Sequence, residues 1–177
     1  MSRKDVLFNL FEIVLLLIFV VIPIRMFLFE PFLVRGLSME PNFHNLDYLI
    51  IDKLTYKFKE PQRGDVIVFK PPLNEKVFYI KRIIGLPNEK IIIQGSTITI
   101  FNKDNPNGFN LKETYLSHYF SKDYLEIQLG EDEYFVLGDN REISYDSRKW
   151  GPLKKQNIIG KVILRFSLVD FVHALTK

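Results

Sequence analysis

A serine in the short segment VRGLSMEP, residues 34–41, has the chemistry of a nucleophile. Ser38 lies two residues after Gly36, in a turn that follows an apolar stretch. A serine in a turn more often has a structural role, because its hydroxyl caps or closes the turn. His44 and Asp47 follow closely, so a Ser–His–Asp triad is one candidate arrangement, although such triads are assembled in space and not by proximity along the chain. The segment supplies a nucleophile without identifying its base.

A lysine inside an apolar run is a different candidate base. The segment KVFYIKRIIGLP, residues 76–87, is typical of a buried strand, yet it holds Lys81 and Arg82 side by side. Neighbouring strand residues point to opposite faces, so at least one of these charges faces whatever the strand packs against. Only Lys81 can accept a proton, because arginine stays protonated, and burial can lower a lysine pKa by several units. The alternative interpretation is an edge strand protected by charge.

Side chains that could support such a site gather in VLGDNREISYDSRKWGP, residues 136–152. The simpler interpretation is a long polar loop with an Asx turn at Asp139 and Asn140. The segment also places serines, acids and arginines together just before an aromatic residue, Trp150. We expect mutually satisfying contacts of this kind: Asp139 or Asp146 with Arg141 or Arg148, and a serine hydroxyl that orients an amine.

The composition argues against several other chemistries. The three histidines, His44, His118 and His173, are far apart and form no H-E-x-x-H motif, and the chain has no cysteine, so no metal site is expected. No glycine-rich phosphate-binding loop is present, so no cofactor is expected either. The net charge is only +3 and the basic residues are scattered, so nucleic acid is not an expected partner.

The elements that must position these residues begin with an apolar N-terminal run. VLFNLFEIVLLLIFVVIPI, residues 6–24, is interrupted only by Asn9 and Glu12, and as a helix it is long enough to span a bilayer core of about 30 Å. A buried core helix is disfavoured because most of the run is apolar on every side. A cleaved signal peptide is disfavoured because no small-x-small site follows. We therefore predict a transmembrane anchor, whose flanking basic residues are too evenly divided to decide its orientation.

After residue 30 the pattern changes to that of a β protein. The turn-rich segment 102–110 predicts a surface loop, and 111–130 is a weaker polar–aromatic region. No stretch shows sustained helical periodicity. The sequence predicts one β-rich domain tethered by its N-terminus. Strands are predicted within 31–36, 47–54, 64–72, 76–85, 89–101, 133–138 and 160–169, with a turn at Gly95–Ser96.

Taken in order, these segments resemble the bacterial type I signal peptidases, membrane-bound serine proteases with a Ser/Lys dyad. The matching motifs are GLSMEP around Ser38, RGDVIVFKPP from residue 63, YIKRIIGLP around Lys81, and GDNREISYDSRKWG from residue 138. The apolar run before the first motif agrees, and the resemblance extends from residue 6 to about residue 165. It implies a mainly β fold, in which an N-terminal transmembrane helix is followed by a single catalytic domain of coiled antiparallel sheets.

The resemblance also implies a role for each matching residue. Ser38 corresponds to the nucleophile, Lys81 to the general base, and Ser144 to a hydroxyl that hydrogen-bonds the lysine amine. The other implied roles are a supporting ion pair (Asp146 and Arg148), loop shaping (Gly138, Asp139 and Asn140), the oxyanion region (Gly36 and the Ser38 backbone), and a position near the substrate or the membrane (Tyr79, and Met39, which partly faces the membrane in this family).

The implied organisation is a short cytoplasmic N-terminus, residues 1–5, an anchor, residues 6–25, and an extracytoplasmic peptidase domain, residues 26–177. Such a protein is a single-pass protein of the cytoplasmic (inner) membrane. Its implied substrates are signal-peptide-bearing preproteins, cut after a small-x-small site through an acyl-enzyme. Membrane lipid and the secretion translocon are its expected neighbours, and no cofactor or metal is implied.

The chain departs from the family pattern at a few positions. Gly36 stands where some members have a serine whose hydroxyl helps to hold the oxyanion. The oxyanion hole then depends on the Ser38 backbone N–H and a second donor that the sequence does not identify. Ile143 stands where many members have asparagine, and Asn42 replaces a common threonine.

Three other functions stay open at this point. One is a catalytically inactive, membrane-anchored peptide-binding module of the same fold. Another is a self-cleaving repressor of related fold, which would need a DNA-binding region where the apolar run lies. The third is a Ser–His–Asp esterase that uses His44.

Overall fold

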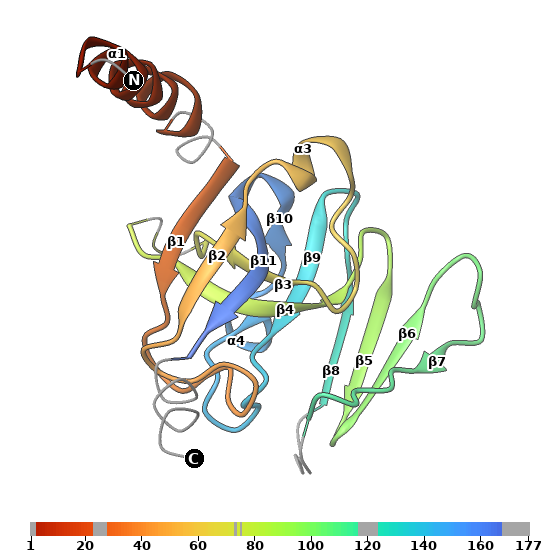
Figure 1. The fold of residues 1–177 in the computed structure, drawn as a ribbon. Helices are drawn as coiled ribbons and strands as arrows, with labels where there is room; N and C mark the ends of the chain where they lie inside the picture. Colours follow the sequence, from red (N-terminus) through yellow and green to blue (C-terminus); the bar gives the residue numbers. More distant parts are fainter. Residues whose placement is uncertain (1–2, 23–27, 73, 75, 117–123, 168–177) are drawn as a thin grey trace.

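The structure is a computed structural model that describes residues 3–22, 28–72, 74, 76–116 and 124–167. An N-terminal helical segment is followed by a body made almost entirely of strands (Figure 1). The helical elements are α1 (Arg3–Leu16), the π-helix η1 (Leu17–Val21), the one-turn helices α3 (Thr55–Phe58) and α4 (Ser147–Trp150), and the 3-10 helix η2 (Lys155–Asn157). The strands are β1 (Phe29–Leu33), β2 (Tyr48–Asp52), β3 (Val66–Phe69), β4 (Tyr79–Gly85), β5 (Lys90–Gln94), β6 (Thr97–Phe101), β7 (Phe109–Asn110), β8 (Tyr124–Gln128), β9 (Glu133–Leu137), β10 (Leu153–Lys154) and β11 (Ile158–Phe166).

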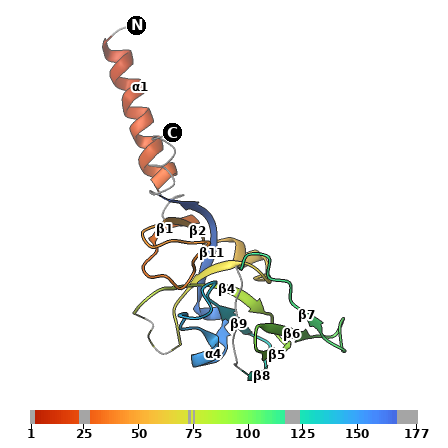
Figure 2. The ribbon, with the colours of Figure 1, turned by 90° about the horizontal axis from the view of Figure 1, so that it is seen from below.

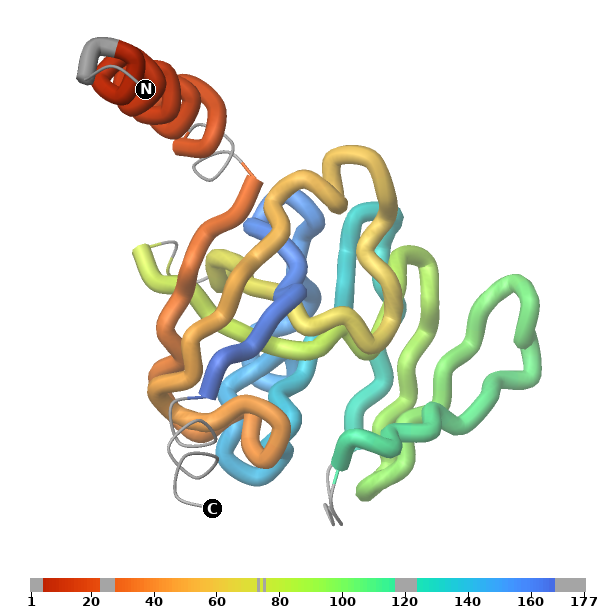
Figure 3. Tube along the Cα trace, viewed as in Figure 1, coloured from red at the N-terminus to blue at the C-terminus, as the bar shows by residue number. Residues whose placement is uncertain are grey.

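The strands form two sheets. The larger has seven strands in the order β1-β2-β11-β3-β4-β9-β10, and the smaller has four in the order β7-β6-β5-β8. Every strand pair in the described part of the chain is antiparallel. The tube view shows β1, β2 and β11 side by side at one end of the larger sheet (Figure 3). The expectation of a mainly β fold with antiparallel sheets is confirmed.

Two apolar cores lie on opposite faces of β4 and β9. Ile84, with Phe135 and Leu137 of β9, belongs to the core that packs against the smaller sheet. Ile83, with Tyr134 and Val136 of β9, belongs to a second core. That core also contains Ile67 and Phe69. Because successive strand residues alternate in direction, β4 presents one face to each core. This alternation decides which way the two charges of β4 point.

The hairpin between β5 and β6 follows from its sequence. Buried isoleucines stand at every second position in both strands, Ile91 and Ile93 in β5 and Ile98 and Ile100 in β6, and they form part of the core against β9. Gln94 pairs with Thr97, so Gly95 and Ser96 make a two-residue turn, in which Gly95 has a φ of 61°. Glycine adopts positive φ without steric cost, which suits it to such a turn. The predicted turn at Gly95–Ser96 is confirmed.

The N-terminal segment projects from the body as α1 and η1 (Figure 2). Between residues 6 and 22 its large apolar side chains are exposed on all sides. Within the described residues, no helix has both the length and the apolar character that crossing a membrane requires. The predicted anchor over 6–25 also includes residues 23–25, which lie outside the described part.

The structure contains elements that the sequence pattern did not predict. Strand β8 lies in the region 111–130 and pairs with β5, and a second sheet forms around that pair. The helices α3 and α4 have four residues each, which is too short to leave a helical period in the sequence. The last predicted strand, 160–169, begins at Ile158 and ends at Phe166 in the structure, and its residues 168–169 lie outside the described part.

Candidate active site

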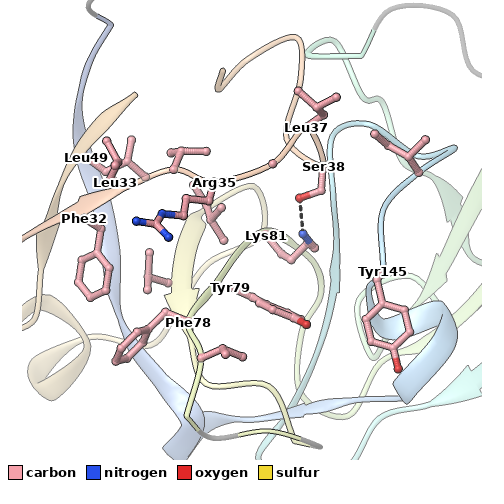
Figure 4. Close-up of a pocket in the computed structure, with 16 residues that line it drawn as sticks. Phe32, Leu33, Arg35, Leu37, Ser38, Leu49, Phe78, Tyr79, Lys81 and Tyr145 are labelled. Atoms are coloured by element: carbon pink, nitrogen blue, oxygen red, sulfur yellow. Dashed lines mark hydrogen bonds between the residues drawn. The ribbon is translucent and has the colours of Figure 1, made fainter. Parts of the chain in front are cut away.

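Strand β4 carries Lys81 to the nucleophile turn. Lys81 is buried, with 4% of its surface exposed, and its Nζ lies 2.6 Å from Ser38 Oγ (Figure 4). Lys81 has the same parity as Ile83, whose side chain is part of the core around Phe69, so the lysine stem follows that face of the strand. The two residues that sequence analysis placed together as nucleophile and base are therefore in direct contact.

The turn that presents Ser38 is held by the chain on its far side. Val34 N donates to Asp47 O at 2.9 Å, which continues the pairing of β1 with β2. Gly36 then has a φ of +98°, a conformation that L side chains rarely adopt. Its N–H donates to Asn45 Oδ1 at 3.0 Å. This glycine lets the chain leave the strand direction and bring Ser38 over β4.

Burial changes the acidity of the lysine. Loss of hydration lowers the pKa of Lys81 from 10.5 to about 8. The negative charges of Asp146 and Asp139 act in the opposite direction, and Arg148 adds a smaller lowering contribution. The ring of Tyr79 lies 5.8 Å from Nζ and covers one side of the amine. A substantial fraction of Lys81 is therefore neutral at slightly alkaline pH.

The loop after β9 lies directly against the nucleophile turn. Asn140 N donates to Ser38 O at 3.0 Å, and Ser144 N donates to Asn140 O at 3.1 Å. A Cβ added at Gly138 would lie 2.2 Å from Ser144 Oγ and 2.4 Å from Ser38 O. Only a residue without a side chain fits between the two serines. These contacts are consistent with the predicted role of Gly138 and Asn140 in shaping the loop.

Ser144 reaches the site, but its hydroxyl is not bonded to the lysine. Its Oγ is buried and, among the residues that the structure describes, has no hydrogen-bond partner. The Lys81 amine donates to Ser38 Oγ. The expected hydrogen bond between Ser144 and Lys81 is thus not formed in this structure. Buried polar groups without partners are costly, so this one points to a functional constraint.

Asp146 organises the base of the loop. It is fully buried and binds Arg148 through two contacts, Nε–Oδ1 at 2.9 Å and Nη2–Oδ2 at 3.0 Å. Its Oδ2 also accepts from Gly138 N at 3.1 Å, and its Oδ1 accepts from Arg148 N at the start of α4. The ion pair expected from the sequence is present.

A second ion pair fixes the other side of the loop. Arg82 binds both oxygens of Asp139, Nε–Oδ1 at 2.8 Å and Nη2–Oδ2 at 2.6 Å. The Arg82 guanidinium also lies 4.0 Å from the ring centroid of Tyr115, and Asn42 Nδ2 donates to Asp139 Oδ2 at 2.9 Å. Asp139 therefore pairs with Arg82 and not with either arginine of its own loop.

Glu113 belongs to this polar cluster and was not identified from the sequence. Arg141 forms a buried ion pair with Glu113, and its Nε donates to Gly138 O at 3.1 Å. Glu113 lies in the polar–aromatic region that carried no recognisable motif. The only signal in the sequence was an acid two residues before an aromatic residue, Tyr115. In the structure Tyr115 donates its hydroxyl to the Glu113 carboxylate.

An open cleft of about 500 Å³ runs beside Ser38 and Lys81. Its walls are mostly apolar and come from the end of β1, the nucleophile turn and the start of β4 (Figure 4). The cleft is wide enough for an extended segment of peptide. The lining side chains that Figure 4 labels are Phe32, Leu33, Arg35, Leu37, Ser38, Leu49, Phe78, Tyr79, Lys81 and Tyr145.

Other candidate residues lie elsewhere. His44 is exposed, and its backbone N–H donates to Asp47 Oδ2 at 2.7 Å, while Asp47 pairs with Arg165. The Ser–His–Asp arrangement is therefore not assembled among the described residues. Met39 is 1% exposed and belongs to the core, so the expectation that it partly faces the membrane is wrong. The turn that presents Ser38 at the cleft directs the next side chain, Met39, into the protein interior.

The described residues contain no group of three His, Asp or Glu side chains placed to hold a metal ion. The chemistry that the arrangement can perform is proton transfer within a serine–lysine pair. A hydroxyl 2.6 Å from an amine of lowered pKa can be deprotonated as it attacks a carbonyl.

Comparison with known proteins gives a consistent result. Residues 7–167 match the family described as signal peptidase, peptidase S26. A probable signal peptidase I-2 of Synechocystis is 37% identical over 160 residues, which is 88% of this chain and 71% of that protein. A signal peptidase I of Bacillus licheniformis is 32% identical over 170 residues, or 90% of this chain and 88% of that protein.

The fold has a counterpart among solved structures. The crystal structure of a signal peptidase I from Enterococcus faecalis matches with a TM-score of 0.50 at 33% identity. The match covers 60% of this chain and 98% of that chain. Similarity in sequence and similarity in fold thus concern the same family.

Proposed function

This chain belongs to the signal peptidase family, peptidase S26, and on that premise we propose that it removes signal peptides with Ser38 as nucleophile and a neutral Lys81 as general base. The single observation that carries the proposal is the contact between Lys81 Nζ and Ser38 Oγ at 2.6 Å, in a buried setting that lowers the lysine pKa. A neutral amine at hydrogen-bond distance meets the geometric and the acid–base requirement of a general base together.

The first half of the reaction forms an acyl-enzyme. Ser38 Oγ attacks the carbonyl carbon of the scissile bond while its proton passes to the Lys81 amine, which becomes an ammonium. The ammonium then gives that proton to the leaving amine as the peptide bond breaks. The acyl group stays on Ser38 Oγ, and Lys81 is neutral again.

The second half consumes one water. The neutral Lys81 amine takes a proton from water, and the hydroxide attacks the ester carbon. The ester bond breaks, Ser38 Oγ recovers a proton from the ammonium, and the new carboxyl terminus leaves. When Ser38 is acylated, the amine has lost the partner it holds here, and we propose that the hydroxyl of Ser144, which has no partner in the described structure and packs against the same glycine as Ser38 O, takes its place.

The oxyanion needs donors near Ser38. The Ser38 backbone N–H is one, and Gly36 supplies no hydroxyl at the position where some family members have one. The Gly36 N–H is engaged by Asn45 Oδ1 at 3.0 Å, which fixes the turn in the shape that orients the Ser38 N–H. Removal of one oxyanion donor typically costs a factor of about 10²–10³ in rate, so the remaining geometry must be well ordered.

The other polar residues hold the dyad in place. Asp146 and Arg148 stabilise the loop from below, and Asp139 is held through Arg82. Asn140 joins this loop to the nucleophile turn through Ser38 O. Each of these residues positions the dyad and touches neither its hydroxyl nor its amine, apart from the field that Asp146 and Asp139 exert on Lys81.

The cleft suits an extended peptide with small side chains next to the cleaved bond. Its walls near Ser38 are formed by bulky residues such as Tyr79 and Ile143, which leave limited depth. Strand β1 is an edge strand, so backbone hydrogen bonds are available for strand addition. These features fit preproteins cut after a small-x-small site.

Attachment to a membrane is the last part of the proposal. The apolar side chains of residues 6–22 are exposed on all sides, which water does not favour. A second exposed apolar surface on β1 and β11, the lipid patch, consists of Phe29, Pro31, Ile163, Leu164 and Phe166. We assign residues 1–5 to the cytoplasm, 6–25 to a single-pass anchor, and 26–177 to an extracytoplasmic peptidase domain next to the inner membrane and the translocon.

The test is cleavage of a signal-bearing preprotein by the full-length protein in detergent. Ser38→Ala and Lys81→Met should each lower cleavage by at least 10³-fold, because each removes one half of the dyad. His44→Ala is the matched control and should cut at the wild-type rate. If Lys81→Met still cuts, the dyad is wrong. If the wild type binds the preprotein without cutting it, the inactive binding module takes its place.

A further inference from the structure

The cleft contains one cation that the proposed mechanism does not use. Arg35 lines the cleft and is exposed. Among the residues that the structure describes, its side chain has no hydrogen bond or ion pair. Its guanidinium points away from Ser38, toward the end of the cleft where Phe32 lies (Figure 4).

The other arginines around the site each have a carboxylate. The pairs are Arg82 with Asp139, Arg141 with Glu113, and Arg148 with Asp146. A guanidinium is always charged and matches a carboxylate through two parallel hydrogen bonds. Arg35 has the same chemistry but faces an open cleft, so it is placed to bind a carboxylate that a substrate brings into the cleft.

The position of Arg35 along the chain sets where that carboxylate would lie. Arg35 precedes Ser38 by three residues, which is at most about 10 Å of chain because the chain turns at Gly36. Val34 uses its N–H and C=O to bond Asp47 and Leu46 on the β2 side, so the opposite side of this segment is free to receive a peptide. An extended substrate that runs along it would therefore bring a residue some distance from the scissile bond to the guanidinium.

We propose that Arg35 makes the cleft prefer preproteins that carry an acidic side chain two to four residues from the scissile bond. This inference rests on the proposed function and adds a charge requirement to it. Leu33 and Val77 line the same cleft, and a bound peptide excludes water from it, which strengthens the attraction between the two charges.

Arg35 acts on the substrate and not on the base. The groups that set the pKa of Lys81 are Asp146, Asp139 and Arg148, together with burial itself. Arg35 is not among them. Its effect should therefore appear as a change in substrate preference, while the pH dependence of cleavage stays where Lys81 places it.

The experiment uses the full-length protein in detergent and a set of otherwise identical preproteins. Each carries Glu, Gln or Lys at one position between −5 and +4 around the cleavage site, with the small residues at −1 and −3 kept. The measured quantity is the ratio of kcat/KM for the Glu substrate to that for the Lys substrate. Because both are measured with one enzyme variant, a general loss of activity cancels.

We expect one position two to four residues from the scissile bond to give a ratio of about ten in the wild type, a size typical of a single ion pair that is partly shielded from water. The ratio should fall to about one in Arg35→Ala and invert in Arg35→Glu. It should also shrink in 0.5 M salt. Lys57→Glu is the matched control, because it reverses an exposed charge on α3 outside the cleft and should leave the ratio unchanged.

A ratio that is the same in the wild type, Arg35→Ala and Arg35→Glu at every position would overturn the inference while cleavage itself upholds the proposed function. The same holds if Arg35→Glu instead reduces binding to vesicles of anionic lipid, which would place Arg35 at the lipid surface. If the wild type cuts none of the preproteins, the proposed function fails and the inference fails with it.

Discussion

Lys81 and Arg82 are neighbours in β4, yet the Lys81 amine lies 2.6 Å from Ser38 Oγ while the Arg82 guanidinium grips both oxygens of Asp139 on the opposite face. One strand thus provides the base and anchors the loop that supports it. Because the two side chains share a backbone, a shift of β4 would disturb both contacts together. Each of the two charges in this apolar strand therefore has its own polar partner.

The pH dependence of cleavage should report the acidity of Lys81. Only the neutral amine accepts a proton, and burial lowers its pKa to about 8. We therefore expect kcat/KM to fall about tenfold for each pH unit below 8 and to level off above it. The profile should be the same in His44→Ala. An acidic limb that disappears in His44→Ala would instead identify His44 as the base.

Stability should respond to the same group with a definite sign. The pKa of Lys81 is about 8 in the folded protein and 10.5 when unperturbed, so between these values the unfolded chain binds more protons. The free energy of unfolding therefore rises with pH in this interval, and below pH 8 the buried charge costs about 3 kcal/mol. Lys81→Met removes this cost and should be more stable than the wild type at pH 7.

The measurement is denaturant unfolding of the wild type and Lys81→Met between pH 7 and 10.5. The advantage of Lys81→Met should shrink as pH rises through 8 and be gone near 10.5. Lys57→Met, which replaces an exposed lysine, is the control and should show a difference that does not vary with pH. An advantage of Lys81→Met that is constant across the range would contradict the pKa shift.

Gly138→Ala should lower both the stability of the fold and the rate of catalysis, because the added methyl group disturbs both. The added Cβ would lie 2.4 Å from the backbone oxygen of Ser38 and 2.2 Å from Ser144 Oγ. Such overpacking costs about 1–3 kcal/mol and should displace the nucleophile turn, lowering kcat by at least tenfold. Gly130→Ala, where the nearest atom is a flexible Glu133 carboxylate at 3.3 Å, is the control, and a normal kcat in Gly138→Ala would refute the close approach.

The lipid patch can be tested without the N-terminal segment. Both cores lie within the body, so a variant that lacks residues 1–25 keeps them. We expect this variant to bind lipid vesicles and Leu164→Glu to weaken the binding about thirtyfold, since burial of one leucine is worth about 2 kcal/mol. Tyr124→Glu, an exposed position on β8 in the other sheet, should have no effect. Absence of vesicle binding by the truncated protein would refute the patch.

The local signals in the sequence predicted the strands that carry the site and the residues that meet there. Alternation and turn residues located β2 to β6 and β9, because those strands carry buried apolar side chains and lie near turn residues such as asparagine, glycine or proline. The chemistry of lysine and arginine settled which neighbour in β4 could be the base. The resemblance to a family, and not the pattern, assigned Ser144, Asp146 and Arg148.

What the sequence could not predict depends on contacts between distant segments. Asp139 had two arginines nearby in its own loop, yet it pairs with Arg82, which is 57 residues away. The pairing of Glu113 could not be predicted, because its partner, Arg141, reaches it only through the tertiary fold. Strand β8 alternates Leu125 and Ile127 with polar residues, a weak pattern that acquires meaning only when β5 lies beside it.

The ion pair between Arg82 and Asp139 should affect stability and catalysis differently. Removal of one partner should destabilise the protein, removal of both should restore most of the stability, and kcat should stay low in either case. Arg82→Met leaves the Asp139 carboxylate, with 1% of its side chain exposed, without its main partner, and should cost about 3 kcal/mol of unfolding free energy. Asn42 still donates to that carboxylate, which keeps the loss below the upper end of the usual range.

Arg82→Met combined with Asp139→Leu removes both charges and should recover most of the stability. Its kcat should stay low, because neither the guanidinium nor the carboxylate remains to hold the loop against Ser38. Denaturant unfolding and preprotein cleavage of these two variants, with Lys155→Met as a control that breaks an exposed pair with Glu60, measure both effects. A double variant with full activity would show that packing alone positions the loop.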